Sequence, residues 1–170
     1  MNRSIYSLSA ILLTAGCVAQ LQADDWVGNN PAHVQTAFEY IWKNEQNNQQ
    51  ELEVLLGIDP VRTEWCAAFV NAVLLKNDIP GSESIHEFPL LAKSFLEWGH
   101  AVHPDDVRSG DIVVFPRGNK GWQGHVGFYI GQTVHDDVLF YLILGGNQDK
   151  MVSVEKYTAK RALAIRRPID

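Results

Sequence analysis

The chain has 170 residues, of which 46% are hydrophobic and 20% are charged, and its formal net charge at pH 7 is −6. This length and balance predict one globular domain with a hydrophobic core of its own. No run of lysine or arginine residues offers a surface for phosphate groups, so we expect no nucleic-acid partner.

Residues 1–23 have the order of an export signal: a positive charge, an apolar stretch, and a small residue before the cleavage point. The apolar stretch, residues 5–15, is too short to span a bilayer permanently, and Ala23 directly precedes the acidic Asp24. A competing interpretation is a lipoprotein signal, because Thr14-Ala15-Gly16-Cys17 would make Cys17 a lipidated N-terminus. We expect an exported protein, periplasmic or secreted, which is an outer-membrane lipoprotein only if Cys17 is lipidated.

The first half of the remaining chain shows the three- and four-residue spacing of amphipathic helices. Pro31 suits the first turn of a helix, and Gly57 and Gly99 suit helix ends. The spacing predicts helices over residues 31–43, 51–56, 63–76 and 88–98.

The second half switches to short runs of β-branched and aromatic residues punctuated by glycine, aspartate and asparagine. These runs predict strands over residues 111–116, 125–132, 138–144, 151–154 and 162–166. Strands that follow a group of helices indicate an α+β domain with an antiparallel sheet. No linker divides the chain, so residues 24–170 are expected to form a single domain.

Cys66 is the first candidate for chemistry. The chain has two cysteines, and if Cys17 leaves with the signal or carries lipid, Cys66 has no partner for an intramolecular disulfide. Thr63 is a candidate N-cap, which would place Cys66 in the first helical turn, where unpaired N–H groups favour a thiolate. The alternative is a buried cysteine that acts as a small hydrophobic residue in the core.

His125 is the second candidate, because it opens an apolar strand directly after the glycine-rich loop 118–124. A neutral imidazole at a strand end can take a thiol proton and later return it to a leaving amine. A lone histidine is more often structural, and five others occur in the chain, none at so clearly marked a strand start: His33, His86, His100, His103 and His135.

A third polar residue would orient the imidazole. Asn147 follows the strand after His125 and is the preferred candidate, with Asp149 as the alternative and Gln148 less favoured. Because glycine and asparagine are turn residues, Gly145-Gly146-Asn147-Gln148 is read almost equally well as a simple hairpin turn.

The order of these motifs resembles that of the NlpC/P60 and CHAP superfamily of papain-like cysteine peptidases and amidases, especially a small branch found in phage lysins and exported bacterial proteins. The strongest part of the resemblance is the Gly-Asp-Ile-Val-Val-Phe run before Gly-His-Val-Gly. The residues that carry it are 65–70, 92–99, 110–115, 124–129, 144–148, 157 and 166–168.

The resemblance implies a papain-like fold, with N-terminal helices packed on a five- to six-stranded antiparallel sheet. It implies hydrolysis of amide bonds in bacterial peptidoglycan, as a stem-peptide endopeptidase or an amidase. Cys66 matches the family's nucleophile and His125 its base, while Asn147 best matches the third member. Many relatives carry a polar or tyrosine side chain shortly before the cysteine in the oxyanion hole; this chain has no tyrosine there, so the backbone N–H of Cys66 is the expected donor.

Substrate contacts are expected at Trp65, Trp122 and Gln148, although helix packing is the favoured role for Trp65. Glu83, His86 and Glu87 lack the spacing of a zinc site, so no metal or other cofactor is expected. An inhibitor or a delivery partner would suit so small an enzyme. The alternative functions are an inactive peptidoglycan- or protein-binding module on the same fold and an acyltransferase.

Overall fold

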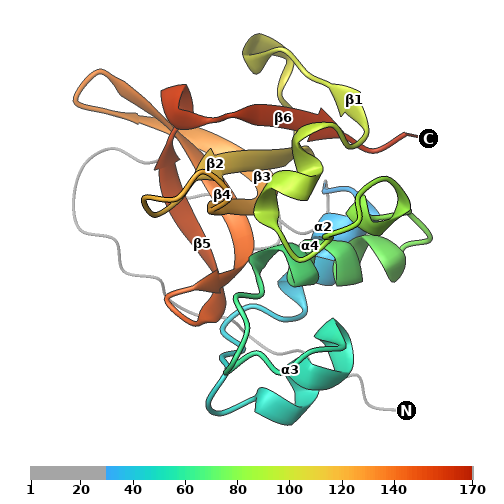
Figure 1. Cartoon of the computed structure of the whole chain (residues 1–170). Coiled ribbons are helices and arrows are strands. Elements are labelled where there is room, and N and C mark those ends of the chain that lie inside the picture. Colours follow the sequence, from blue (N-terminus) through green and yellow to red (C-terminus); the bar gives the residue numbers. More distant parts are fainter. Residues whose placement is uncertain (1–29, 170) are drawn as a thin grey trace, which may run out of the picture.

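The computed structural model describes residues 30–169, in which helices occupy the first half and an antiparallel sheet the second (Figure 1). The α-helices of this segment are α2 (Ala32–Phe38), α3 (Gln49–Leu56) and α4 (Cys66–Leu75). Short 3-10 turns connect them to the sheet: η1 (Ser82–Ser84), η2 (Ala92–Leu96), η3 (Pro104–Asp106) and, later, η4 (Ala159–Arg161). The predicted export signal and Cys17 lie outside the described residues.

The sheet has six strands in the order β1-β6-β2-β3-β4-β5, and every neighbouring pair is antiparallel. The strands are β1 (His100–Ala101), β2 (Ile112–Pro116), β3 (Gly124–His135), β4 (Val138–Gln148), β5 (Met151–Thr158) and β6 (Ala164–Arg167). The predicted α+β class and the antiparallel sheet are therefore confirmed, and all five predicted strands are present.

Two of the predicted helices differ clearly from the structure. α2 ends at Phe38, because the following residues leave the helix to pair with the edge of the sheet: Trp42 donates to the carbonyl of Val152, and Val152 donates to that of Lys43. The predicted helix over 88–98 is wrong, since only η2 forms there. Tertiary contacts have overridden the helical periodicity in both segments.

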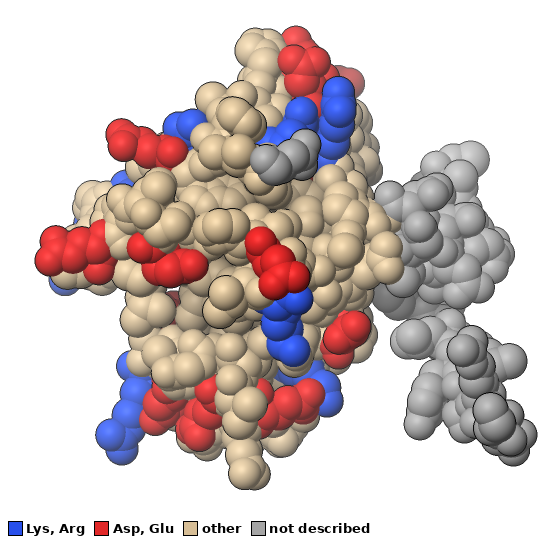
Figure 2. Space-filling model, turned by 90° about the vertical axis from the view of Figure 1, so that its right-hand side faces the viewer, with Lys and Arg blue, Asp and Glu red and all other residues tan. Residues whose placement is uncertain are grey.

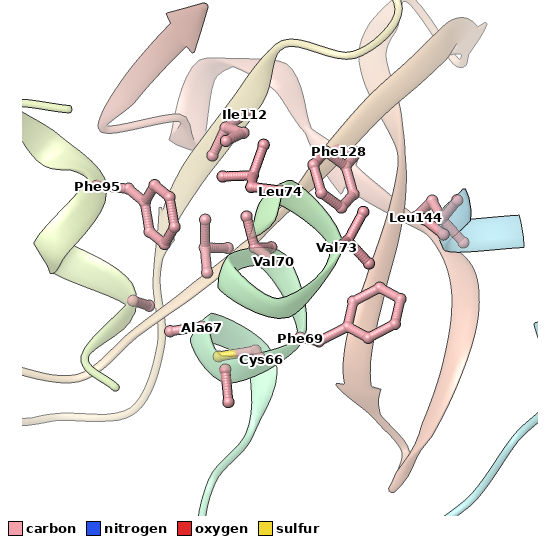
Figure 3. Packing of buried hydrophobic residues seen from close by; sticks show 14 of the residues in the cluster. Cys66, Ala67, Phe69, Val70, Val73, Leu74, Phe95, Ile112, Phe128 and Leu144 are labelled. Atoms are coloured by element: carbon pink, nitrogen blue, oxygen red, sulfur yellow. The ribbon is translucent and has the colours of Figure 1, made fainter. Parts of the chain in front are cut away.

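Both faces of the sheet are covered by apolar side chains. Figure 3 shows α4 directing its side chains at one face and at η2, in a buried cluster that includes Phe69, Val70, Val73, Leu74, Phe95, Ile112, Phe128 and Leu144. A second buried cluster covers the other face, with Val113, Phe115, Tyr129, Tyr141, Ile143 and Ile165. α4 is thus fixed against β3 and β4, which positions its first residue over the sheet.

The close approach of β4 to α4 requires a glycine at position 146. A Cβ added to Gly146 would lie 2.6 Å from Cβ of Phe69 and 2.6 Å from the Trp65 ring. We expect Gly146→Ala to lower the free energy of unfolding by about 1–3 kcal/mol through overpacking. Gly121→Ala is the matched control, because its Cβ would meet nothing within 4 Å. Equal urea midpoints for the two variants would contradict this packing.

No helix within residues 30–169 has the length and apolar content needed to cross a bilayer. On the face shown in Figure 2, lysine and arginine side chains are scattered among acidic ones and form no continuous basic stripe.

Candidate active site

Cys66 is the first residue of α4, so its sulfur lies beside backbone N–H groups that have no acceptor within the helix. Thr63 is not the N-cap: Trp65 occupies that position without a side-chain cap, and the first helical bond runs from the Phe69 N–H to the Trp65 carbonyl. The prediction of Cys66 in the first turn is confirmed, although the helix begins later than expected. Cys66 is buried and forms no disulfide within the described segment.

The thiol lies where α4 meets the start of β3. Burial raises the pKa of the Cys66 thiol above its usual value, and the negative charge of Glu64 acts in the same direction. The backbone N–H groups of Val126 and Ala67 and the positive charge of Arg117 oppose this shift by favouring the thiolate. Because Val126 follows His125, the contact brings the sulfur to the backbone beside the candidate base.

His125 is buried on the sheet with its ring between aromatic and polar groups. Its imidazole stacks on Tyr157, with centroids 5.1 Å apart and planes inclined by 15°, and Tyr157 in turn stacks on Phe115. The ring Nε2 lies 3.0 Å from Oε1 of Gln148. Tyr157 therefore holds one face of the imidazole, and Gln148 holds one of its two nitrogens.

The Gln148 amide settles which imidazole nitrogen carries the proton. Its NH2 group donates to the Ser153 carbonyl at 2.7 Å and to the Ile143 carbonyl at 3.3 Å, so its oxygen faces the ring. That oxygen accepts from Nε2–H of His125, which leaves the lone pair on Nδ1. The nitrogen available to exchange a proton with a thiol or an amine is therefore Nδ1.

Asn147, the predicted orienting residue, lies elsewhere. Its side-chain amide donates to Glu64 at 2.6 Å, and its backbone adopts a left-handed conformation with φ 55°. The side chain that contacts the imidazole is that of Gln148, the least favoured of the three predicted candidates. Asp149, the other alternative, also has a left-handed backbone (φ 48°).

The expected substrate contacts divide into buried and exposed residues. Trp65 is fully buried and Gln148 is 2% exposed, so neither offers a surface to a substrate. Trp65 instead packs edge-on against Phe69. Trp122 is 55% exposed, in the loop between β2 and β3, and its indole remains accessible three residues before His125.

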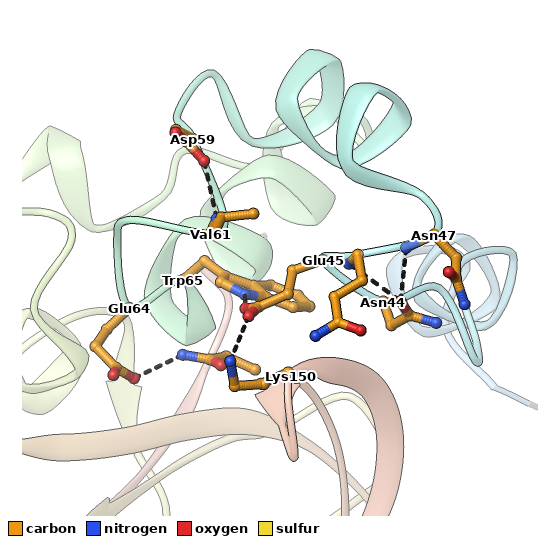
Figure 4. Close-up of polar contacts among 10 residues, drawn as sticks. Asn44, Glu45, Asn47, Asp59, Val61, Glu64, Trp65 and Lys150 are labelled. Carbon is orange, nitrogen blue, oxygen red and sulfur yellow. Dashed lines mark hydrogen bonds and ion pairs between the residues drawn. The ribbon is translucent and has the colours of Figure 1, made fainter.

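A polar network ties the segment before α4 to the turn between β4 and β5 (Figure 4). The carboxylate of Glu45, 4% exposed, lies between Trp65 Nε1 at 3.4 Å and Lys150 Nζ at 2.8 Å. The bond from Asn147 to Glu64 joins the same two segments a short way off. These bonds fix the start of α4 relative to the strand end that carries Gln148.

Arg117 is the residue of the site that sequence reasoning missed. It follows β2 directly, and its Nη1 lies 3.5 Å from His125 Nδ1, while both terminal nitrogens donate to the Asn147 carbonyl at 3.3–3.4 Å. No sequence pattern marks this position, because a single arginine after a strand is ordinary. Burial lowers the pKa of His125 to about 4, and the positive charge of Arg117 contributes to this shift.

The low pKa of His125 predicts a particular dependence of stability on pH. The folded protein keeps this imidazole neutral, whereas the unfolded chain takes up a proton below a pKa of 6.5, so acid favours unfolding. We expect the free energy of unfolding to fall between pH 6.5 and 4, by at most about 3 kcal/mol from this group.

The His125→Gln variant should show a shallower slope of stability against pH over this range, measured by urea unfolding at each pH. Burial lowers the pKa of His33 as well, so part of the slope should remain in the variant. An unchanged slope would mean that His125 binds its proton equally well in both states.

Other features of the described residues offer less chemistry. A hollow of about 710 Å³ lies between α3 and α4, lined in part by Tyr40, Val54, Leu55 and Leu75, and contains no cysteine or histidine. Residues 30–169 contain no group of three or more His, Cys, Asp or Glu side chains suited to a metal ion. The meeting point of α4, β3 and β4 is therefore the best candidate site.

A comparison of the chain with models of known protein families found no match, and a comparison with curated proteins found none either.

Proposed function

We propose that the protein is an exported cysteine hydrolase of the papain-like NlpC/P60 type, which cuts amide bonds in bacterial peptidoglycan. The observation that carries the proposal is a thiol at the start of α4 that contacts the backbone of Val126, the residue after a buried His125 whose lone pair is on Nδ1. Peptidoglycan as the substrate rests on the resemblance of the motifs.

The proposed reaction passes through a thioester. The proton on Sγ of Cys66 moves to Nδ1 of His125, and the sulfur attacks the amide carbonyl carbon. Unpaired N–H groups at the start of α4 donate to the resulting oxyanion. Nδ1–H then protonates the leaving nitrogen as the carbon–nitrogen bond breaks, and water, deprotonated by Nδ1, releases the acyl group as a carboxylate.

Gln148 and Tyr157 act on the imidazole in this proposal rather than on the substrate. Gln148 keeps the proton on Nε2 in the resting state and accepts a hydrogen bond from the imidazolium during the reaction. Tyr157 forms one wall of the ring pocket. The base therefore holds one orientation through both proton transfers.

A second candidate is an inactive binding module on the same fold, which the burial of Cys66 favours. Its side chain is 4% exposed and burial raises its thiol pKa, as in an inert core cysteine. For hydrolysis, a substrate would have to displace some of the residues that bury the Cys66 sulfur.

The experiment that separates the two functions is digestion of purified peptidoglycan by the purified protein, with products identified by mass spectrometry. New fragments with a free amine at a cut amide would support the hydrolase. A folded protein that yields no fragments, and whose Cys66 does not react with iodoacetamide, would support the binding module.

A further inference from the structure

Arg117 lies beside His125 without a structural task that explains it. The side chain is exposed, and within residues 30–169 no carboxylate lies within ion-pair distance of its guanidinium. Its contacts are with the Asn147 carbonyl and with Nδ1 of His125, all at 3.3 Å or longer. These bonds are long and hold the group weakly.

Arg167 shows what a structural arginine looks like in this fold. Its Nε and Nη2 donate to the two oxygens of the buried Asp111, both at 2.8 Å, which is the paired geometry that guanidinium and carboxylate prefer. Arg117 has the same planar set of donors, but among the residues that the structure describes no carboxylate receives them. The N–H donors of the Arg117 guanidinium are therefore available to an anion that enters the site.

The position of Arg117 indicates which part of a substrate it would meet. Since Gln148 occupies Nε2 of His125, the leaving nitrogen must approach Nδ1 to receive its proton. The guanidinium lies beside this same nitrogen. In an α-amino acid residue the nitrogen and the carboxyl group share one carbon, so a leaving nitrogen at Nδ1 brings its own α-carboxyl group to Arg117.

We propose that Arg117 binds the free α-carboxylate of the residue that leaves, so that the enzyme cuts amides whose amine-side α-carbon bears an unblocked carboxylate. The inference rests on the proposed function and narrows its substrates. Suitable bonds are amides whose nitrogen belongs to a C-terminal residue. Amides whose nitrogen belongs to a residue at a branch point are also suitable, if that residue keeps its α-carboxylate free. An internal peptide bond, whose amine-side carboxyl group is itself an amide, brings no charge to the guanidinium.

The same contact links substrate binding to the base. An N–H of Arg117 points at the Nδ1 lone pair that must accept the thiol proton. A carboxylate draws the guanidinium to itself and offsets its charge, which otherwise disfavours a proton on His125. Substrates with a free α-carboxylate therefore also make Nδ1 of His125 available to accept the thiol proton.

The binding step can be tested without hydrolysis, by NMR titration of the His125 ring signals with alanine and with alaninamide, each as both enantiomers. We expect one alanine enantiomer to shift the signals and neither amide to do so. Arg117→Gln should abolish the shift, whereas Arg161→Gln, a matched loss of an exposed arginine, should retain it. No shift with either alanine, or a shift that survives Arg117→Gln, would overturn the inference.

The cutting specificity can be tested with peptidoglycan before and after its carboxyl groups are converted to methylamides. We expect every cut to free an amine beside an unblocked carboxylate, and amidation to slow cutting about 10- to 100-fold, as for a lost charge-assisted pair. For the Arg117→Gln variant, the rate of cutting of untreated peptidoglycan divided by that of amidated peptidoglycan should approach one.

Equal cutting of both polymers by the wild type would overturn the inference and leave the hydrolase intact. No Cys66-dependent cutting of either polymer would refute the proposed function instead, and the NMR titration would then decide the role of Arg117 by itself.

Discussion

Replacing Cys66 with alanine is expected to abolish the release of fragments from peptidoglycan, by about 10⁴-fold or more, because residues 30–169 contain no other thiol that could form the thioester. The substitution removes one buried sulfur from the start of α4. It should change the free energy of unfolding by only about 1 kcal/mol, as a small cavity does. The measurement is the rate of fragment formation by mass spectrometry, with folding checked by circular dichroism.

Ala68→Gly is a suitable control, because Ala68 is also buried in the first turn of α4 but carries no reactive group. It should weaken the helix by about 1 kcal/mol and keep the activity. If the Cys66→Ala protein released the same fragments as the native protein, the cut would come from another group and the proposed mechanism would be wrong.

The elements of the site were predictable where a local pattern decides them. Cys66 was expected at a helix start, and α4 begins there. His125 was expected at a strand start, and β3 begins at Gly124. The first prediction rests on the helix expected over residues 63–76 with Thr63 as its N-cap, and the second on an apolar run directly after a glycine-rich loop. Both patterns lie in neighbouring residues, although the cap itself is Trp65.

The partner of the imidazole was not predictable, because it depends on a bulge. Strict alternation along β4 from Ile143 would put Gly145 and Asn147 on the side of His125. The register shifts between Gly145 and Gln148, with Asn147 in a left-handed conformation, so one extra residue moves Gln148 to that side. The pattern of residues carries no sign of this shift, since Gly-Gly-Asn-Gln suits a regular turn equally well.

Arg117 was not predictable for a different reason, which is that its contacts depend on the pairing of β2, β3 and β4, and one of them comes from a distant part of the chain. The guanidinium meets His125 on β3 and the carbonyl of Asn147 on β4, 30 residues away in sequence. Apart from Trp122, the loop 117–123 contains only glycines and polar or charged residues. Long-range contacts of this kind follow from the register of the sheet and not from local periodicity.

Gln148→Ala is expected to lower kcat/KM for peptidoglycan fragments about 10²- to 10³-fold with little change in KM. Without the Gln148 oxygen, Nε2–H of His125 is left buried without its acceptor, and the ring loses the bond that keeps its lone pair on Nδ1. Gln148→Glu, which keeps an acceptor at the same place, should restore part of kcat. Its pH–rate profile should move to higher pH, because the added negative charge raises the pKa of His125.

Asn147→Gly is the matched comparison, because glycine accepts the left-handed backbone at position 147 and keeps the carbonyl that Arg117 contacts. The variant loses only the bond to Glu64 and should keep kcat within about tenfold, as expected for a single hydrogen bond remote from the base. A large loss in Asn147→Gly together with a small loss in Gln148→Ala would reverse the assignment and return the orienting role to Asn147. The two variants differ by one position in the chain, so the comparison tests directly whether the bulge in β4 selects the residue that positions the base.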